Sequence, residues 1–576
     1  MTKEAKQVPY GIANFETIIT QGFYYVDKTQ FIPLLESQPR NLFCTRPRRF
    51  GKSLLLSMLR CYYDCRKKDD FNRLFGNLWI GQHPTENQGR YQILYLDFSQ
   101  VGGDMAHIEE RFDSYCGKRI DTFVDRYSAH YPQEVAAAVK ASKGCADKLD
   151  LLCNYAQEHE LPLYLIIDEY DNFTNTILNE QGEAVYHAIM HANGFYRDMF
   201  KKFKGNFERI FMMGVSPVTL DDVTSGFNVG WNISIKPEFN ELLGFSTEDV
   251  REMFNYFKQT GDLPAQCDVE AMIADMKPWY NNYCFARQSC ATGIQIFNCG
   301  MVLYYLRNFM SQDCAPRQMI DPNTKTDYAK MKKLLQFDQL DGDRKGVIRK
   351  IAEEGRIVAT LLESFPATSL ADPEIFPSLL FYYGMLTIQG TLGNLTVLGI
   401  PNNNVRKQYY GYLLEQYQEI HRSNLNDILL KFAYMALEGR WREALEAMAE
   451  EYAQVSSVRD SIEGERNLQG FFMAYFNLMD YYYTAPELEL NHGYCDFFLL
   501  PDLTHYDTKH SYIVELKVLH KGYTQEQAER QWSDAVSQIK RYAKAPKVEA
   551  LRQGTRLHLI IMQFEGHQLH RMEEVN

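Results

Sequence analysis

The sequence of 576 residues has no long hydrophobic run. Its longest apolar stretches, Leu163–Ile167 and Leu557–Met562, are far too short to span a bilayer, which needs about 20 apolar residues. The first residues, MTKEAKQVPYGIANFE, carry no apolar segment behind their lysines, so we expect no signal peptide. The sequence therefore predicts a cytoplasmic protein with no membrane partner.

The sequence also lacks a cysteine pattern that is typical of metal or disulfide sites. Its 12 cysteines are scattered, none forms a CxxC pair, and the closest two are Cys61 and Cys65. That spacing fits no zinc knuckle, and we expect mostly buried, reduced thiols. Basic residues are in deficit, since 61 Lys and Arg face 74 Asp and Glu, a net charge of −13. Any contact with nucleic acid must therefore use a local basic patch.

The remaining composition is that of a globular protein, with 45% hydrophobic and 23% charged residues, and three regions differ in pattern. The first region, residues 1–245, alternates short apolar strands with helix-length segments. This alternation favours an α/β fold with a parallel sheet that helices cover on both faces. The predicted strands are Asn41–Thr45, Gln92–Asp97, Tyr164–Asp168 and Arg209–Val215.

The second region, residues 246–458, is mostly helical. Apolar residues three and four apart predict one helix over Ala436–Tyr452, and Met385–Ile400 predicts a β-hairpin that turns near Gly393-Asn394. The third region, residues 459–576, is a small α/β unit. Its predicted elements are a helix over Gln469–Tyr482, strands over Asp496–Leu500, Tyr512–Val518 and Arg556–Phe564, and a helix over Gln525–Ala543.

The first candidate site lies in the loop after the first predicted strand. This strand ends at Thr45, a loop containing Gly51-Lys52-Ser53 follows, and an apolar helix comes next. In a P-loop of this kind, backbone N–H groups cradle phosphates, Lys52 would reach the β- and γ-phosphates, and Ser53 would ligate Mg²⁺. The usual loop has Gly five positions before Gly51, where this chain has Arg46. The motif alone also fits a Gly-Lys-Ser sequence at the start of a surface helix.

Two carboxylates at the end of a later strand favour nucleotide binding. Residues 163–169 (LYLIIDE) end in Asp168, which would hold the Mg²⁺ shell, and Glu169, which would activate the attacking water. Asp171 fits a cap or loop residue better than a ligand. Ser216 ends the next predicted strand and is a candidate sensor of the γ-phosphate, although a turn Ser before Pro explains it equally well.

Further motifs give a specific resemblance to a known family. RPRRFGKS, with PYGIANFETIITQGFYYVDKT, IIDEYD, GVSP, FNELLGF, WYNNYCF and LFYYGMLTI, is similar to the bacterial AAA-ATPase-like family. That family has Arg in place of the loop Gly and carries a C-terminal PD-(D/E)XK nuclease-like domain. The resemblance covers nearly the whole chain and implies that the whole loop binds nucleotide. The loop consists of Arg46, Pro47, Arg48, Arg49, Phe50, Gly51, Lys52 and Ser53, of which the second and third arginines either neutralise phosphate or point to solvent.

A second acidic pattern lies in the third region. If the strands of Asp496 and Glu515 pair as a hairpin centred near His505 and Tyr506, the two residues are opposed, with Cβ atoms about 4.5–5.5 Å apart. Two carboxylates at that distance make a divalent-metal site. Lys517 shares the strand face of Glu515 and would stabilise developing charge or lower the pKa of a metal-bound water. The alternative is that Glu515 and Lys517 face water on an edge strand.

This pattern resembles the PD-(D/E)XK nuclease core, and the resemblance implies three more residues. Glu465 corresponds to a helix-borne carboxylate that completes the metal shell. Gln538 corresponds to a helix glutamine behind the site, and Tyr542 lies one turn later on the same face. Basic residues in this part of the chain either track a phosphate backbone or form a solvated helix face. They are Lys521, Arg530, Lys540, Arg541, Lys544 and Lys547.

Together these patterns predict a Mg²⁺-dependent ATPase coupled to a nuclease that cuts DNA or RNA with Mg²⁺ or Mn²⁺. Glu169 would be the catalytic residue of the first site, and Asp496, Glu515 and Lys517 those of the second. The predicted partners are ATP and nucleic acid. The alternative is an ATP-driven switch whose C-terminal domain binds nucleic acid or a protein without cleavage. Metal binding by the C-terminal domain would separate the two interpretations.

Overall fold

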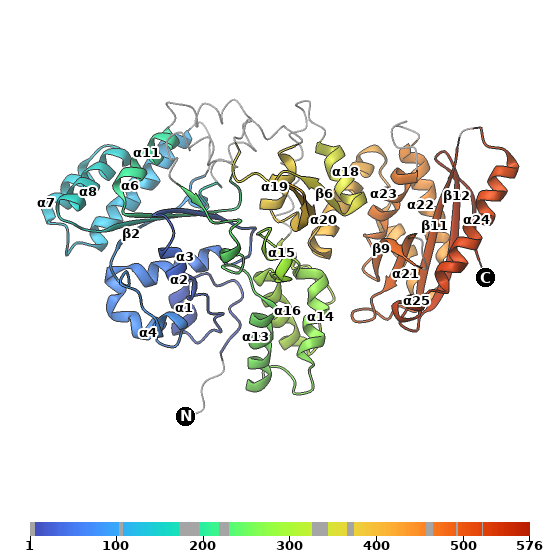
Figure 1. Cartoon of the computed structure of the whole chain (residues 1–576), viewed down its shortest axis with the longest axis horizontal. Helices are drawn as coiled ribbons and strands as arrows, with labels where there is room; N and C mark the ends of the chain where they lie inside the picture. Colours follow the sequence, from blue (N-terminus) through green and yellow to red (C-terminus); the bar gives the residue numbers. More distant parts are fainter. Residues whose placement is uncertain are drawn as a thin grey trace. The chain divides into compact units, whose positions relative to one another are not determined.

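A computed structural model describes the chain in two compact units (Figure 1). The described residues are 6–102, 107–171, 195–217, 230–324, 344–365, 374–456, 465–490, 494–520 and 522–575. Unit 1 comprises Met1–Cys314, Ile320–Val347 and Arg356–Asn403, and unit 2 comprises Ala315–Met319, Ile348–Gly355 and Asn404–Asn576. The three-part division at residues 245 and 458 stays a prediction.

Unit 1 contains the parallel sheet that the sequence predicts. Its strands are β1 (Asn41–Thr45), β2 (Gln92–Asp97), β3 (Leu163–Asp168), β4 (Arg209–Gly214) and the short β5 (Trp231–Asn232). They run in the order β2-β3-β4-β1-β5, and every neighbouring pair is parallel. Four strands lie where they are predicted, whereas β5 is too short for the pattern to reveal. Because all strands run the same way, the loops after β1 and β3 lie at one edge.

Helices cover both faces of this sheet. Figure 1 shows α1–α4 on one face and α6, α8 and α11 on the other. The helices are α1 (Phe15–Thr20), α2 (Phe31–Glu36), α3 (Lys52–Tyr63), α4 (Phe71–Phe75), α5 (Trp79–Gln82), α6 (Ile108–Arg126), α7 (Gln133–Ala141), α8 (Cys145–Glu158) and α11 (Phe195–Asn206). Strand β3 is buried along its whole length, as a parallel strand between two helix layers requires.

The chain beyond this sheet is mostly helical, as predicted. Its helices are α13 (Thr247–Thr260), α14 (Val269–Tyr280), α15 (Ser289–Thr292), α16 (Cys299–Gln312), α18 (Arg344–Glu354), α19 (Phe376–Tyr382) and α20 (Asn403–Ile420). The predicted hairpin is confirmed: β7 (Thr387–Leu392) and β8 (Leu395–Gly399) pair antiparallel around Gly393-Asn394. A third strand, β6 (Arg356–Ala359), pairs with β8 and was not predicted.

The prediction of a single helix over Ala436–Tyr452 is wrong. Helix α21 (Leu425–Glu438) ends at Gly439, and α22 (Trp441–Ser456) begins two residues later. Gly439 adopts φ +75°, the left-handed conformation that commonly ends a helix. The apolar spacing continues across this break, so the period alone hides it.

Unit 2 contains a mixed five-stranded sheet. Its strands are β9 (Tyr482–Glu489), β10 (Tyr494–Pro501), β11 (His510–Leu519), β12 (Arg556–Glu565) and β13 (Gln568–Glu574), in the order β13-β12-β11-β10-β9. Only β11 and β12 pair parallel, and α24 (Gln525–Ala543) with α25 (Pro546–Leu551) connects them. The predicted helix over Gln469–Tyr482 is shifted, because α23 spans Glu465–Phe476 and its aromatic continuation enters β9. The sequence pattern missed β9 and β13.

Both faces of the second sheet are buried. On one face, Ile513 of β11 and Ile561 of β12 share an apolar cluster with Trp532 and Ile539 of α24. On the other, Phe497 of β10 contacts a phenylalanine of α23, Phe476, with ring centroids 5.3 Å apart. Any charged side chain on a central strand therefore requires a specific partner.

Two further findings concern membrane-spanning helices and cysteines. Among the residues that the structure describes, no helix is long and apolar enough to cross a membrane. All twelve cysteines are free thiols, and most of them are buried or half-buried.

Gly244, in the FNELLGF motif, offers a test of the packing around Phe50 and Ile296. It has φ +82°, and an added Cβ would lie 2.4 Å from Ile296 and 2.9 Å from the Phe50 ring. Gly244→Ala is expected to lower stability by about 2–4 kcal/mol, because it combines left-handed strain with overpacking. Gly261 has φ +85° and open space around it. Gly261→Ala therefore serves as the matched control, at about 1 kcal/mol. Equal melting temperatures of the two variants would contradict this assignment.

Candidate functional site

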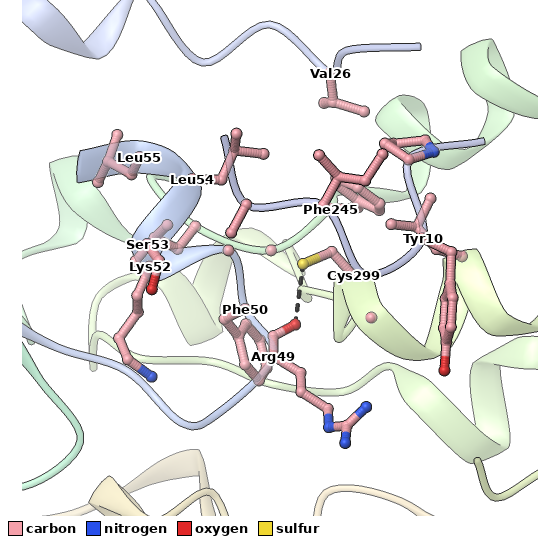
Figure 2. Close-up of a pocket in the computed structure, with 18 of the residues that line it drawn as sticks. Tyr10, Val26, Arg49, Phe50, Lys52, Ser53, Leu54, Leu55, Phe245 and Cys299 are labelled. Atoms are coloured by element: carbon pink, nitrogen blue, oxygen red, sulfur yellow. Dashed lines mark hydrogen bonds between the residues drawn. The ribbon is translucent and has the colours of Figure 1, made fainter. Parts of the chain in front are cut away.

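The predicted phosphate loop joins β1 to α3 in unit 1. Gly51 precedes α3 with φ +92°, so the chain turns sharply and the helix begins at Lys52. The loop lines a pocket of about 720 Å³, drawn in Figure 2. Backbone N–H groups of the first helical turn have no partner within a helix, which makes this end suited to bind anions.

Lys52 and Ser53 lie next to the carboxylates that end β3. The Lys52 ammonium donates hydrogen bonds to the carbonyl oxygens of Arg46 and Pro47, both at 3.1 Å. Burial lowers the pKa of Lys52, and the carboxylates of Glu169 and Asp168 act in the opposite direction. The Ser53 hydroxyl donates to Asp168 Oδ2 at 2.8 Å. The structure therefore brings together the two residues that the sequence predicts as Mg²⁺ ligands.

The remaining predicted residues near β3 and β4 have different positions. Glu169 lines the pocket and adopts φ +49°, while burial raises the pKa of Asp168 beside it. The Asp171 carboxylate accepts hydrogen bonds from the backbone N–H groups of Val215 and Ser216, which agrees with a capping residue. Ser216 is completely buried and is not one of the described residues that line the pocket.

The Arg46 side chain is buried and does not line the pocket. Its side chain is only 1% exposed, and its guanidinium donates to three carbonyl oxygens: Thr45 at 3.0 Å, Ser234 at 2.6 Å and Phe239 at 2.8 Å. The guanidinium carbon also lies 4.2 Å from the centre of the Phe285 ring. These contacts commit the Arg46 side chain to holding the loop, so nucleotide binding by Arg46 stays a prediction that concerns its backbone. The sequence gives no sign of this, because two of the three carbonyl partners, those of Ser234 and Phe239, lie about 190 residues away.

The next loop residues also contact segments that are distant in sequence. Gly384 of the LFYYGMLTI motif is so close to Pro47 that an added Cβ would lie 2.7 Å from the proline ring. The carbonyl oxygen of Arg48 accepts from the Asn298 amide at 3.2 Å. That of Arg49 accepts from the Gly300 N–H at 3.1 Å.

Phe50 fills the space between these segments. Its ring packs edge-on against Tyr283 and Phe285 of the WYNNYCF motif, with centroids 5.0 and 5.5 Å away. Its carbonyl oxygen accepts from the Gly244 N–H at 3.0 Å. Three motifs of the family resemblance, LFYYGMLTI, WYNNYCF and FNELLGF, therefore contact the loop.

The side chains of Arg48 and Arg49 were predicted either to neutralise phosphate or to point to solvent, and the structure bears on this choice for Arg49. Arg49 has φ +65°, and its guanidinium pairs with the buried Asp321 carboxylate at 3.2 Å. The Tyr10 hydroxyl donates to the same carboxylate at 2.6 Å. Arg49 therefore does not point freely to solvent. Arg48 lines the pocket with it.

The other pocket walls come from segments that motif analysis did not assign. Figure 2 shows Tyr10, Val26 and Phe245 across the pocket from the loop, with Cys299 between them. The Cys299 thiol donates to the Arg49 carbonyl oxygen at 3.0 Å. These walls are largely apolar, so the pocket has a polar end at the loop and an apolar remainder. In the sequence, the only sign of these pocket walls was the aromatic YGIANF and YYVDK stretches, whose tyrosines resemble core residues.

The second candidate site lies on β10 and β11 of unit 2. Phe497 pairs with Val514 and Phe498 with Ile513. Continuing this register by one residue would set Asp496 opposite Glu515, and the Asp496 carboxylate accepts a hydrogen bond from the backbone N–H of Leu516, the residue after Glu515. The Glu515 carboxylate is 1% exposed and accepts from the Lys517 ammonium at 2.7 Å. This burial argues against the alternative that Glu515 faces water on an edge strand.

Asp496 is held by two partners that fix its carboxylate. One oxygen accepts from the Leu516 backbone N–H at 2.6 Å, and the other from the Gln469 amide of α23 at 2.6 Å. Sequence analysis missed Gln469, although it lies one helical turn after Glu465. The Glu465 side chain lies outside the described residues. On α24, the Gln538 amide donates to the Tyr542 hydroxyl at 2.5 Å, as their shared face predicts.

These groups suit a hard divalent cation that keeps several waters. Carboxylate oxygens are the ligands that Mg²⁺ and Mn²⁺ prefer, and Mg²⁺ commonly uses only one or two of them. Asp496 and Glu515 provide such a pair in a buried setting. Within the described part of the chain, no three His, Cys, Asp or Glu side chains gather closely enough for a metal site.

The basic residues near this site are solvent-exposed. Lys521 lies outside the described residues, and the others are Arg530, Lys540, Arg541, Lys544 and Lys547 on α24 and its C-terminal continuation. Their exposure agrees equally with a solvated face and with a phosphate-tracking surface.

Comparison with known proteins agrees with both sites. Residues 9–224 match the family described as predicted AAA-ATPase, and residues 463–574 match the PD-(D/E)XK nuclease superfamily. The chain joins an AAA-ATPase-like domain to a PD-(D/E)XK nuclease-superfamily domain. These matches confirm the resemblance drawn from the motifs. The AAA-ATPase-like match contains the loop and β3, and the nuclease-superfamily match contains Asp496, Glu515 and Lys517.

Two individual proteins are also similar to this chain. An uncharacterized protein in the vnfD 5′ region of Azotobacter chroococcum mcd 1 is 24% identical over 281 residues, which is 48% of each chain. The chain thus spans about half the length of this relative. The solved structure of the Aeropyrum pernix ORC2 protein, in ADPNP–ADP complexes, aligns with 11% identity and a TM-score of 0.31. The alignment covers 68% of this chain and 92% of that one.

The fork of hydrogen bonds around Arg46 gives a direct test in the AAA-ATPase-like domain. Arg46→Lys keeps the charge but removes the planar fork, so buried carbonyl oxygens lose partners and stability should fall by about 2–4 kcal/mol. Arg90→Lys is the matched control, because Arg90 is 46% exposed and pairs with Glu208. Calorimetry should give a lower melting temperature for Arg46→Lys alone. Indistinguishable melting temperatures would contradict the structural assignment of Arg46.

Proposed function

We propose that this protein binds and hydrolyses ATP with Mg²⁺, and that ATP controls a metal-dependent nuclease acting on DNA or RNA. The observation that carries the proposal is the carboxylate of Asp496 bonded to the backbone next to the buried Glu515, which itself pairs with Lys517. The arrangement of Lys52, Ser53 and Asp168 supports the ATPase half. The order of the two domains suggests the control.

In the ATPase half, the α3 N-terminus and Lys52 would bind the phosphates. The Ser53 hydroxyl and Asp168, now 2.8 Å apart, would hold Mg²⁺, which neutralises charge on the β- and γ-phosphates. Lys52 must exchange its two carbonyl partners for phosphate oxygens, and its buried ammonium favours that anionic partner. Glu169 lines the same pocket and would orient the attacking water. Ser216 stays a candidate sensor that acts through the buried end of β4.

In the nuclease half, Asp496 and Glu515 would hold Mg²⁺ or Mn²⁺, with Glu465 completing the shell. The metal supplies a Lewis acid at the scissile phosphate. Lys517, whose ammonium is 2.7 Å from Glu515, would stabilise charge that develops on the phosphate oxygens. Gln469 positions Asp496, while Gln538 and Tyr542 support the site from α24.

The first prediction from the proposed function concerns nucleotide binding by the full-length protein. Lys52→Ala should weaken ATP affinity at least tenfold, about 1.4 kcal/mol, because it removes a charge-assisted contact to phosphate. Calorimetric titration with ATP and Mg²⁺ measures this. Lys201→Ala is the control, since Lys201 is exposed and pairs with Asp198 on α11. Equal affinities in the two variants would refute the role of Lys52.

The second prediction concerns cleavage. With Mg²⁺ or Mn²⁺, the full-length protein should cut labelled single- or double-stranded DNA or RNA, and chelation with EDTA should stop it. Asp496→Asn should abolish cutting, since it removes a metal ligand's charge. Asp507→Asn is the matched control, because Asp507 is 88% exposed in the β10–β11 connection. Comparison of wild type with Lys52→Ala, each with and without ATP, tests control by nucleotide.

A failure of cleavage would have a definite meaning. If ATP hydrolysis is intact and no substrate is cut, the second candidate function replaces the first. In that case ATP drives a switch, and the C-terminal domain binds nucleic acid or a protein without cutting. Calorimetric titration of wild type and Asp496→Asn with Mn²⁺ separates an unused metal site from an absent one.

A further inference from the structure

Two cysteines beside the nucleotide loop lie close enough to react with each other. Cys284, in the WYNNYCF motif, and Cys290, on the short α15, have their sulfur atoms 3.1 Å apart. A disulfide bond needs about 2.05 Å, so the sulfurs must approach by roughly 1 Å. The backbone N–H of Cys284 donates to the Thr387 hydroxyl at 2.7 Å, and its carbonyl oxygen accepts from Ile388 N–H at 3.3 Å. These bonds fix Cys284 against β7.

The two thiols differ in exposure and in acidity. Stepwise oxidation requires one accessible thiolate that reacts first and a second thiol beside it. Cys284 is buried, whereas Cys290 is half-buried and reaches solvent. The hydrogen bond from Cys284 lowers the pKa of Cys290, and the same contact together with burial raises the pKa of Cys284. Thiolates attack oxidants, so Cys290 is the more reactive of the two.

We propose that Cys284 and Cys290 form a reversible intrachain disulfide, with hydrogen peroxide as the oxidant. The Cys290 thiolate attacks one peroxide oxygen, the O–O bond breaks, and hydroxide is the leaving group. The product on Cys290 is a sulfenic acid. The Cys284 sulfur then attacks that of Cys290, the S–O bond breaks, and the leaving hydroxide takes the Cys284 proton as water. Two thiols lose two electrons and two protons, and one peroxide becomes two waters. A dithiol such as dithiothreitol reverses the reaction by thiol–disulfide exchange.

The position of the pair connects it to the nucleotide loop. Tyr283 and Phe285 flank Cys284, and both rings pack against Phe50. Phe285 also lies under the Arg46 guanidinium. Closing the disulfide strains the backbone bonds that hold Cys284 against β7, and this strain should displace the two flanking rings and weaken ATP binding. This consequence rests on the proposed function, whereas formation of the disulfide does not.

Peptide mapping of the full-length protein tests the disulfide. After treatment with peroxide and blocking of free thiols, mass spectrometry should find a Cys284–Cys290 link that dithiothreitol removes. Cys116 and Cys145 are the internal control, because they share a hydrogen bond but both are buried. Cys284→Ser should leave a sulfenic acid on Cys290 that dimedone traps, whereas Cys290→Ser should give no trapped adduct on Cys284. A pair that stays reduced while peroxide oxidises other thiols would overturn the proposal, as would preferential linkage of Cys116 to Cys145.

Titration with ATP and Mg²⁺ tests the connection to the loop. The oxidised wild type should lose affinity, dithiothreitol should restore it, and Cys290→Ser should not respond to peroxide. Unchanged affinity in a preparation whose disulfide is mapped would overturn the connection. If the reduced wild type binds no ATP, the proposed function fails, while the mapping result still decides whether the disulfide forms.

Discussion

The buried guanidinium of Arg46 is the contact on which the nucleotide loop depends. A charge that is 1% exposed is tolerated only where hydrogen bonds replace water, and three carbonyl oxygens do so here. Two of these oxygens belong to Ser234 and Phe239, so the loop cannot form its shape before the chain beyond β5 has folded around it. The Phe285 ring completes the enclosure.

This arrangement explains how the loop keeps a fixed shape without its usual first glycine. Glycine-rich loops approach phosphate by backbone freedom, whereas this loop is fixed by side-chain contacts with distant segments. Pro47 meets Gly384, Phe50 meets Tyr283, and the Arg49 carbonyl oxygen meets α16. These contacting segments all lie with the parallel sheet in unit 1. The proposed disulfide between Cys284 and Cys290 connects to the loop through the neighbouring rings of Tyr283 and Phe285, which pack against Phe50.

The second unit reaches its site by a simpler constraint. The antiparallel register of β10 and β11, continued one residue past Phe497 and Val514, brings Asp496 to Glu515, and the two-residue strand period turns Lys517 to the same face as Glu515. Each charge is then matched: Lys517 bonds to Glu515, and Gln469 with the Leu516 N–H bonds to Asp496. The strand register fixes where the acids lie, and α23 fixes how Asp496 is oriented.

The sequence by itself determined the features that depend on local pattern. These are the four main parallel strands, the Gly51-Lys52-Ser53 turn into α3, the β7–β8 hairpin, and the opposition of Asp496 to Glu515, because strand period and turn position are both written in short stretches. The tertiary structure alone decided the contacts between distant residues. It enclosed the Arg46 guanidinium among carbonyl oxygens, recruited Gln469 to Asp496, ended α21 at Gly439, and set Cys284 beside Cys290. The partners of Arg46 and Gln469 lie far along the chain, the end of α21 depends on one backbone angle, and the contact between the two cysteines depends on the turn that separates them. None of these leaves a periodic signal in the sequence.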